Sequence, residues 1–480
     1  MTDIFGTRYR PSLLAAAIPF VCLLASLLGV IVFRGADAVA GYGPWILLGS
    51  AAIALGISAS GRIATRRSLV AGLRRSASQI LPAVPILFCI AMVATTWMLS
   101  GVVPTLIHYG LEFLSPALFL VTACTVCAVI SVMSGSSWTT IATIGVGFMG
   151  VGTVMGYSEA WIAGAIISGA YFGDKVSPLS DTTVVASSTV GVDLFTHIRY
   201  MMYTTIPAFV IALGVYLAVG MSSGASAPSE GSDIAAALEE SFRISPWTLI
   251  IPAATILLII LRVKTLYVLG AATLLGAAGI FIFQPELGLG LADVLKSLAI
   301  GSAVETGNAE LDELASTGGL LGMLPTVFLV LSALVFGGVM IGTGMLRKLT
   351  DAFTSRLRRR TSLVGATVAT GLTMNCMTAD QYLAIILTGN MYKGRYRAAG
   401  FSDKLLSRTV EDSVSVTSVL IPWNSCGLTQ STVLGVSTLA YLPFCIFNLL
   451  TPLMSILIAR IGLGIPTPSR REFLPHSALR

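Results

Sequence analysis

One stretch decides how the rest of this chain is interpreted: Ser168-Gly-Ala-Tyr-Phe-Gly-Asp174-Lys175-Val-Ser177-Pro-Leu-Ser180-Asp181-Thr182-Thr183. Two carboxylates, a lysine and several hydroxyls stand here between apolar segments. A charged side chain at the centre of a bilayer costs about 2.5–3.5 kcal/mol on insertion scales, so charges inside membrane helices usually handle ions or protons. We therefore expect the functional chemistry of the chain at this stretch.

The composition is that of a membrane protein. Of the 480 residues, 55% are hydrophobic and only 11% are charged, against roughly 25% charged residues in a soluble domain. Several apolar runs approach or reach the roughly 20 residues that cross a bilayer as a helix; they are 13–33, 45–60, 81–99, 117–133, 203–219, 247–261, 266–283, 320–345 and 439–461. The first run is too long for a signal peptide and has no small-residue cleavage site after it. The sequence predicts an all-α polytopic protein of the bacterial inner membrane, surrounded by lipid.

The net charge of +6 is not a nucleic-acid signal, because the basic residues gather in short loops. These loops contain Arg8 and Arg10, Arg62 to Arg75, Arg262 and Lys264, Arg347 to Arg360, Lys393 to Arg408, and Arg470 and Arg471. The positive-inside rule places them in the cytoplasm. The acidic loops, with Glu230 to Glu240 and Glu305 to Glu313, are then outside. Both termini are predicted to be cytoplasmic.

The cysteines and histidines do not indicate a transition-metal site. Cys124 and Cys127 have the CxxC spacing, but no second CxxC accompanies them, and they lie in an apolar run, which favours buried small residues. The three histidines are scattered along the chain. We expect no cofactor, no enzyme activity and no metal other than sodium.

The chain divides into two halves with the same internal plan. We predict a first membrane half over 1–220, an extracytoplasmic connection over 221–245, a second membrane half over 246–463 and a cytoplasmic tail over 464–480. Each half has two polar interruptions of its apolar helices. They lie at 134–140 and 174–183 in the first half, and at 373–381 and 411–427 in the second.

Such matched interruptions are typical of transporters built from two inverted-topology repeats, whose binding site lies where the helices break. Unwound backbone leaves carbonyl groups free, and it is tolerated in a membrane only where it lines a protected or watery cavity. Pro178 and Pro422 favour the breaks, because proline lacks a backbone donor and disfavours helical dihedrals just before it. We expect re-entrant hairpins and discontinuous helices that meet near the middle of the membrane.

The motifs resemble one family. The segments 164–183, 193–199 (Asp-Leu-Phe-Thr-His-Ile-Arg), 203–207, 411–413 and 421–427 (Ile-Pro-Trp-Asn-Ser-Cys-Gly) are similar to those of the NhaC-type sodium/proton antiporters. This resemblance implies membership of the ion transporter superfamily, export of sodium driven by protons, and a homodimer. Val184 departs from the family pattern, because many relatives carry an asparagine there that offers a polar ligand.

The residues fit such an exchange. A carboxylate that binds either a proton or sodium, and rarely stands empty while the site changes sides, couples two opposing fluxes. Asp174 and Asp181 are the first candidates, followed by Asp380, Glu411 and Asp412. Hard oxygen ligands are expected from the hydroxyls of Ser177, Ser180, Thr182, Thr183 and Ser413 and from the amides of Asn375 and Asn424. Structural or gating candidates are Lys175, Ser136, Ser137, Trp138 and Trp423.

Each acidic candidate also has a structural interpretation. Asp174 and Lys175 are neighbours that can form an ion pair and hold the break. Asp181 can cap a helix N-terminus, and Asp380 and Asn375 can cap the helix at the second-half break. Either Glu411 or Asp412 can face the cytoplasm and pair with Arg408.

The tryptophans and His197 have competing interpretations too. Trp138 and Trp423 flank polar breaks, but interface anchoring accounts for most membrane tryptophans. His197 titrates near neutral pH and is a candidate pH sensor. Its position close to Arg199, at the cytoplasmic start of an apolar run, equally favours a surface residue at the membrane interface.

Other functional classes account for fewer features. Phe172-Gly-Asp174 resembles part of an intramembrane aspartyl protease signature, but the expected glycine and the Tyr-Asp pair are missing. A channel does not need two broken repeats with central acids. The stronger alternative is a carrier of the same family that exchanges small organic acids, such as malate or lactate, or amino acids with cations, since Lys175 and helix N-termini can hold a carboxylate.

Overall fold

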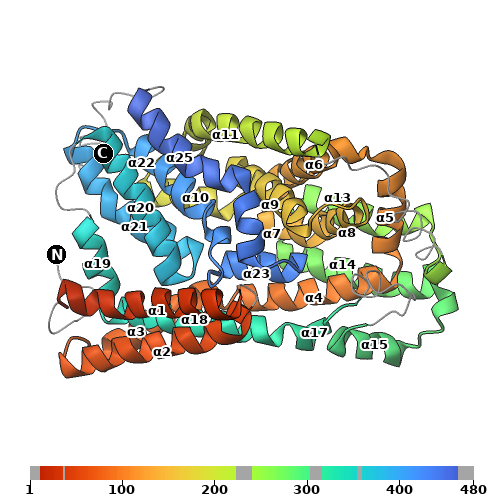
Figure 1. Cartoon of the computed structure of the whole chain (residues 1–480), viewed down its shortest axis with the longest axis horizontal. Helices are drawn as coiled ribbons and strands as arrows, with labels where there is room; N and C mark the ends of the chain where they lie inside the picture. Colours follow the sequence, from red (N-terminus) through yellow and green to blue (C-terminus); the bar gives the residue numbers. More distant parts are fainter. Residues whose placement is uncertain (1–10, 36–37, 223–239, 303–315, 354–358, 463–480) are drawn as a thin grey trace.

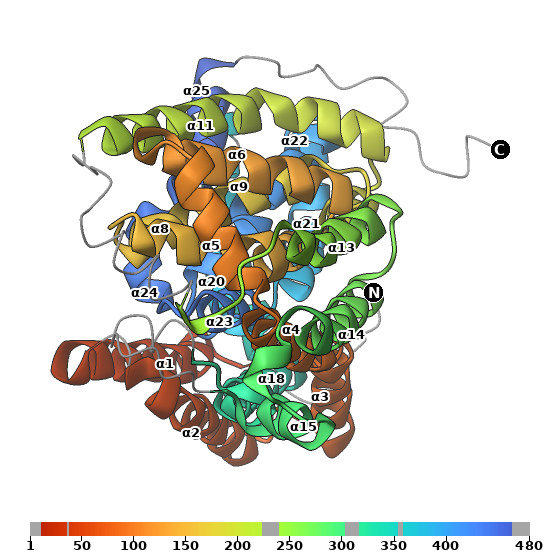
Figure 2. The same ribbon diagram turned by 90° about the vertical axis from the view of Figure 1, so that its right-hand side faces the viewer.

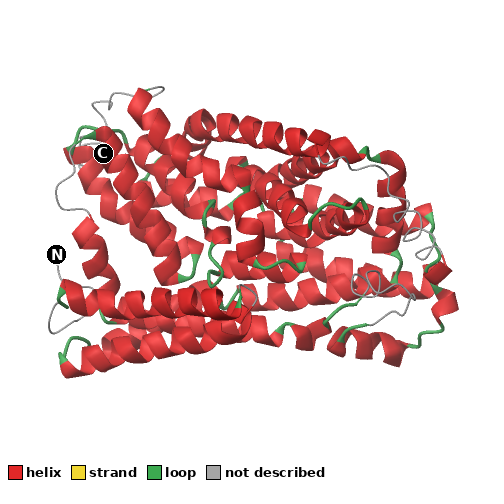
Figure 3. Ribbon diagram, in the orientation of Figure 1, coloured by secondary structure: helices red, strands yellow, loops and turns green. Residues whose placement is uncertain are grey.

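The computed structural model describes residues 11–35, 38–222, 240–302, 316–353 and 359–462, and within these ranges it consists of helices and loops without a strand (Figure 3). Several sequence predictions fall outside the described residues. They concern Arg8 and Arg10, most of the 221–245 connection, the acidic loop from Glu305 to Glu313, and the tail with Arg470 and Arg471.

Among the described residues, seven helices are long and apolar enough to cross a membrane, or up to nine if each of two bent pairs is one span. The seven are Leu13–Arg34, Gly41–Ser60, Pro116–Ser134, Ser137–Val154, Leu194–Ser222, Thr265–Phe283 and Gly319–Gly342, and the bent pairs are Val84–Leu99 with Val102–Phe113 and Thr438–Phe444 with Ile446–Ile461. The predicted multi-pass membrane architecture is confirmed. The Ser137–Val154 helix was not predicted, because serine and threonine at its start mask the apolar residues that follow.

Four helices form a panel along one side of the molecule (Figures 1 and 2). They are α1 (Leu13–Arg34), α2 (Ala38–Ser60), α3 (Arg66–Ile80) and α18 (Leu324–Gly342). Helices α3 and α18 pack backbone to backbone at glycines. A Cβ on Gly72 would lie 2.6 Å from the backbone nitrogen of Gly342, so a larger residue would separate the two helices.

A second group continues the panel at its far end (Figure 1). It contains α4 (Ala83–Leu99), α5 (Val102–Phe113), α13 (Ile250–Ile260), α14 (Thr265–Phe283), α15 (Leu291–Ile300) and α17 (Gly319–Gly322). Helix α19 (Met345–Phe353) follows α18 at the opposite end, beside α1 (Figure 1). The indole of Trp97 in α4 donates a hydrogen bond of 3.3 Å to the carbonyl of Ala272 in α14. A tight turn joins α13 to α14, and in it Arg262 has a positive φ of 62°.

The remaining helices form a body above the panel (Figure 2). In the first half these are α6 (Phe119–Ser134), α7 (Ser137–Thr140), the π-helical turn η2 (Ile141–Gly145), α8 (Val146–Val154), α9 (Glu159–Val176), α10 (Asp181–Val190) and α11 (Leu194–Ser222). In the second half they are α20 (Arg360–Thr378), α21 (Gln381–Ala398), α22 (Asp403–Val410), the π-helical turn η5 (Glu411–Ser415), the 3-10 turn η6 (Ser418–Leu420), α23 (Ser425–Leu434), α24 (Thr438–Tyr441) and α25 (Ile446–Ile461). Short 3-10 turns at Pro116–Leu118, Pro246–Leu249, Pro285–Leu287 and Leu442–Phe444 connect the others.

Cys124 and Cys127 lie in α6 and are fully buried. No group of three or more His, Cys, Asp or Glu residues that could hold a metal ion occurs in the described part of the chain. The two cysteines therefore pack as small core residues, as their apolar surroundings predict.

Candidate functional site

Four helical segments of the body end inside it, at the four predicted breaks. The two ends of the first half contact each other, and so do the two ends of the second half. In the first half, α6 ends at Gly135, whose φ is +67°, and α9 ends just before Pro178. A Cβ on Gly135 would lie 2.6 Å from the carbonyl carbon of Leu179, so the loop after α9 rests directly on this glycine. Glycine is required here by both the left-handed conformation and the close approach.

The breaks of the second half are joined by hydrogen bonds. Helix α20 ends at Ala379, and the carbonyl of Ala379 accepts a hydrogen bond of 2.8 Å from the backbone N–H of Ser425. The side chain of Asn424 donates to the carbonyl of Asn375 at 3.1 Å, and the indole of Trp423 donates to the carbonyl of Cys376 at 2.8 Å. These bonds satisfy carbonyls that the end of α20 leaves free.

All four breaks line one cavity of about 530 Å³. Its walls contain three carboxylates, Asp174 and Asp181 from the first half and Asp380 from the second. The cavity is also lined by Ser134, Gly135, Ser136, Trp138, Leu179, Thr182, Gln381, Tyr382, Ser425, Pro82, Ile86 and the α13–α14 turn from Arg262 to Leu266. The structure thus brings together acids that are some two hundred residues apart in the sequence.

Asp174 is half-buried and faces the start of α7. Its Oδ2 accepts a hydrogen bond of 2.7 Å from the hydroxyl of Ser137 and one of 3.2 Å from the backbone N–H of Ser137. Charge-assisted bonds of this kind are short and orient a carboxylate. The Asp174 carboxylate is therefore fixed in orientation where it lines the cavity. Ser137 holds it, and the neighbouring Ser136 lines the same cavity.

Asp181 is exposed to the cavity at the first position of α10. The N-cap is Ser180, whose hydroxyl accepts from the N–H of Thr183 at 3.5 Å, so the prediction that Asp181 could be the cap is wrong. Ser180 also shares a hydrogen bond of 2.9 Å with the hydroxyl of Thr182. Val184 is 42% exposed.

Several predicted oxygen ligands are used within the fold. Ser177 donates to the carbonyl of Val132 at 2.8 Å, Thr183 to that of Lys175 at 3.1 Å and Ser413 to that of Thr409 at 2.6 Å. Asn375 donates to the carbonyl of Val414 at 2.7 Å, and the Asn424 side chain caps α23 by accepting from the N–H of Cys426 at 3.1 Å. None of these side chains lines the cavity.

Asp380 has the capping role that was one of its two predictions, and its role in ion binding stays a prediction. It lines the cavity and it caps α21, because its Oδ1 accepts a hydrogen bond of 2.8 Å from the N–H of Leu383. Of the two tryptophans, Trp138 lines the cavity with an indole N–H that has no partner, and Trp423 is only 8% exposed. Neither position is that of a membrane-interface anchor.

Lys175 forms an ion pair with Asp412 of the π-helical turn η5, and not with its neighbour Asp174. The hydroxyl of Thr204 donates to the same Asp412 oxygen at 3.1 Å, and Nε of Arg408 lies 3.7 Å from the other oxygen. Lys175, Arg408 and Asp412 are all 1% exposed or less. The predicted pairing of Arg408 with Asp412 is present, but inside the protein and not at a cytoplasmic surface.

Glu411 is also fully buried, but neither of its oxygens has a hydrogen-bond partner. It faces a small space lined by Tyr171, Asp174, Lys175, Thr182, Gln381, Ser415 and Val416, which is too small to admit a water molecule. Asp174, Thr182 and Gln381 line this compartment and the large cavity alike. The two spaces are therefore adjacent.

His197 is completely buried, so the expectation of a surface residue is wrong. Its Nδ1 shares a hydrogen bond of 2.6 Å with the hydroxyl of Ser407, and its Nε2 has no partner. A role in pH sensing stays a prediction.

Several residues of the cavity wall were not predicted by the sequence analysis, among them Gln381, Tyr382, Arg262 and Lys264. Gln381 and Tyr382 follow Asp380 directly, so their place beside the break was a usable signal. Arg262 and Lys264 are exposed residues that were used only for topology. Nothing in the sequence indicates that their turn reaches the cavity, where the hydroxyl of Thr139 donates to that of Thr265 at 3.0 Å.

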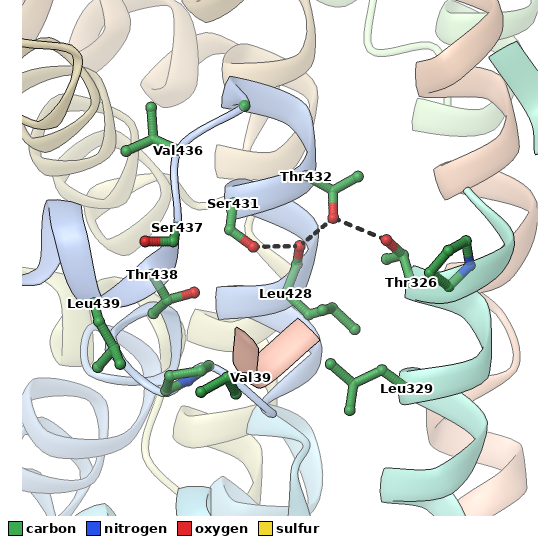
Figure 4. Close-up of a pocket in the computed structure, with 13 residues that line it drawn as sticks. Val39, Thr326, Leu329, Leu428, Ser431, Thr432, Val436, Ser437, Thr438 and Leu439 are labelled. Carbon is green, nitrogen blue, oxygen red and sulfur yellow. Dashed lines mark hydrogen bonds between the residues drawn. The ribbon is translucent and has the colours of Figure 1, made fainter. Parts of the chain in front are cut away.

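A second cavity, of about 380 Å³, lies between α18 and the α23–α24 segment (Figure 4). Thr326 and Thr432 bridge it with a hydrogen bond of 3.1 Å, and Ser431 donates to the carbonyl of Leu428 at 3.0 Å. No charged residue lines it. It therefore lacks the carboxylates that an ion site in this protein would use.

Comparison with known proteins agrees with the resemblance found in the motifs. A model of the Na+/H+ antiporter family matches residues 11–189 and residues 169–463. The chain belongs to the Na+/H+ antiporter family. It is 40% identical over 383 residues to the Na+/H+ antiporter NhaC of Alkalihalophilus pseudofirmus, covering 79% of this chain and 82% of the relative.

Two relatives from Bacillus subtilis differ in what their names describe. One, called Na+/H+ antiporter NhaC, is 35% identical over 394 residues, which are 82% of this chain and 86% of the relative. The other, called malate-2H+/Na+-lactate antiporter, is 35% identical over 366 residues, which are 76% and 78% of the two chains. This Na+/H+ antiporter family thus includes members named for inorganic ions alone and a member named for organic acids.

Proposed function

We propose that this protein exchanges sodium ions for protons across the membrane by alternating access. The observation that carries the proposal is the cavity in which Asp174, Asp181 and Asp380 meet at the ends of broken helices from both halves. Carboxylates and hydroxyls are the hard oxygen ligands that alkali cations prefer, and acids inside membrane helices commonly mark ion and proton pathways. The reaction is transport and needs no catalytic residue.

The order of helices supports the proposal of two repeats. In the first half, α6 breaks before α7, and α9 breaks before α10 and is followed by α11. In the second half, α20 breaks before α21, and the α22 segment breaks before α23 and is later followed by α25. A π-helical turn occurs once in each series, at η2 and at η5. We propose that the two series are inverted repeats, with 221–245 as the extracytoplasmic connection and both termini in the cytoplasm.

The experiment uses purified protein in liposomes with a trapped pH indicator. An imposed sodium gradient should move protons without any organic solute present. Asp174→Asn and Asp181→Asn should each reduce the rate by at least tenfold. Glu159→Gln, which removes an exposed carboxylate from the far end of α9, should leave it unchanged. Full exchange in both aspartate variants would refute the proposed site.

A second function is favoured by the two cations at the cavity. Arg262 and Lys264 line the same space as the three carboxylates, so one wall can hold a carboxylate group while the other holds a cation. The alternative is therefore the exchange of small organic acids or amino acids with cations. Proton movement that appears only when malate, lactate or an amino acid is added would support this function over simple sodium exchange.

A further inference from the structure

The adjacent residues Glu411 and Asp412 have opposite surroundings. Asp412 has cations near both oxygens: Lys175 and Thr204 contact one, and Nε of Arg408 lies 3.7 Å from the other, which accepts no hydrogen bond. An ion that approached Asp412 would have to displace Lys175, a tethered cation. Asp412 is therefore a poor ligand for a transported ion.

Glu411 has the opposite environment. It is completely buried, its two oxygens have no donor, and its compartment admits no water. An ionised carboxylate without partners is strongly disfavoured in such a place. Lys175 lines the same compartment but is paired with Asp412, and the neighbouring hydroxyls of Thr182 and Ser415 are neutral. The group must therefore hold a proton whenever no further positive charge is close by.

Sodium at Asp174 would supply that charge. Asp174 lines both the open cavity and the compartment of Glu411. A cation bound to Asp174 in the cavity is therefore separated from Glu411 by the Asp174 side chain. Coulomb interactions are much stronger in a water-poor interior than in solvent. Binding of sodium thus favours release of the Glu411 proton to the water of the cavity, and loss of sodium favours its return.

The charges of the cluster fit this one-for-one exchange. The charged or titratable groups that face Glu411 are Tyr171, Asp174 and Lys175 of α9, with Asp412 and Arg408 on its own segment. Thr182 of α10 and Gln381 of α21 are neutral. Helices α20 and α25 contribute neutral amides, Asn375 and Asn448, which donate to the backbone of this segment.

Lys175 and Arg408 balance two carboxylates, Asp174 and Asp412, when Glu411 is protonated. When sodium is bound and Glu411 is ionised, Lys175, Arg408 and the sodium ion together balance three carboxylates, which are Asp174, Asp412 and Glu411. The buried cluster is then neutral in both states. It carries a net charge when it holds both ions or neither, which is the condition that couples the two fluxes.

We propose that Glu411 carries the exchanged proton, while Asp412 is a fixed counter-charge held by Lys175 and Arg408. This proposal rests on the proposed exchange of sodium for protons. It assigns the sodium ion to the open cavity at Asp174 and the proton to the closed compartment behind it.

The test uses Glu411→Gln protein and separates sodium binding, measured on purified protein, from proton movement, measured in liposomes. Equilibrium binding of radioactive sodium needs no proton, and it should persist with the dissociation constant for sodium raised about tenfold, because the ion loses a nearby negative charge. Proton movement driven by a sodium gradient should fall more than tenfold. Glu411→Asp should restore proton movement, and Glu159→Gln should change neither assay.

Two results would overturn the proposal. Undiminished proton movement in E411Q would show that another group carries the proton. Loss of sodium binding in a monodisperse E411Q protein would show that Glu411 is a ligand of sodium itself. If E411Q is not monodisperse, Glu411→Ala is taken through the same assays with the same criteria. Wild-type protein that moves sodium but never protons would refute the proposed function, which is a different outcome.

Discussion

The ion pair between Lys175 and Asp412 joins the two halves of the chain, and its removal should have unequal effects on stability. In Lys175→Met, Asp412 keeps the Thr204 hydroxyl at 3.1 Å and Arg408 at 3.7 Å. In Asp412→Asn, both Lys175 and Arg408 lose their counter-charge. Breaking a buried ion pair lowers the free energy of unfolding by about 3–5 kcal/mol. We expect a loss near the lower end of this range in K175M and near the upper end in D412N.

The double variant distinguishes a true pair from two independent losses. Once Asp412 is neutral, removing Lys175 also removes an uncompensated buried cation. The double variant should therefore lose about 5 kcal/mol of stability and not the sum of the two single losses. The difference between that sum and the observed loss, about 3 kcal/mol, is the coupling energy of the pair. At about 2 °C per kcal/mol for a large chain, Tm should fall by about 6 °C in K175M and about 10 °C in both D412N and the double variant.

A thiol-reactive dye that fluoresces on reaction provides the assay in detergent. Cys124, Cys127, Cys426 and Cys445 are fully buried and become reactive when the helices separate. The expected order of Tm is wild type, then K175M, then D412N with the double variant. A D412N protein as stable as K175M, or a double variant whose loss equals the sum of the single losses, would refute the pairing.

Three further predictions concern the cavity and its surroundings. Ser137→Ala removes the 2.7 Å hydrogen bond to Asp174 and should raise the KM for sodium about tenfold, since a bond to a charged group contributes about 1.5–3 kcal/mol; Ser431→Ala, in the uncharged cavity of Figure 4, is the control and should leave KM unchanged. Replacing Arg262 and Lys264 together with glutamine should lower the KM for sodium about threefold at low ionic strength, and the difference should vanish at about 1 M choline chloride if these exposed charges act by electrostatic repulsion. Asp193 lies just before α11, where the N–H of Thr196 donates to its carboxylate at 2.9 Å and lowers the pKa of Asp193. The resulting stability is fully present above the ordinary Asp pKa and is lost as pH falls through the lowered pKa, so the Tm difference between wild type and Asp193→Ala should be constant near neutral pH and should shrink as the pH falls below the ordinary Asp pKa.

The sequence predicted the membrane class, the family and the acids that meet in the cavity. Composition and apolar runs indicate the helices, and matched polar interruptions place Asp174, Asp181 and Asp380 where helices end. The same reasoning could not find the partner of Lys175, because Asp412 lies 237 residues away. A neighbour in sequence, Asp174, was the only partner that spacing suggested.

Other errors have a similar physical cause. Ser177 and Thr183 resemble ligands by residue type, but they donate to carbonyl groups in the last turns of α6 and α9, those of Val132 and Lys175. His197 was expected at the surface because Arg199 follows it, yet a helix turns by about 100° per residue and positions two apart face different sides. The approach of the Arg262 turn is set by tertiary packing and has no local signal.

The π-helical turn of Glu411–Ser415 limits how this segment can change during evolution. Such a turn contains one residue more than an α-helical turn, and such turns are frequently found at functional sites. Deleting any one of its residues would restore ordinary helical geometry but rotate every preceding side chain by about 100° relative to those that follow. Arg408, in α22 before the turn, would then no longer face its present neighbours. Substitutions are therefore tolerable at selected positions of this turn, but a change in its length is not, and relatives with a shorter segment here should differ in the ions they couple.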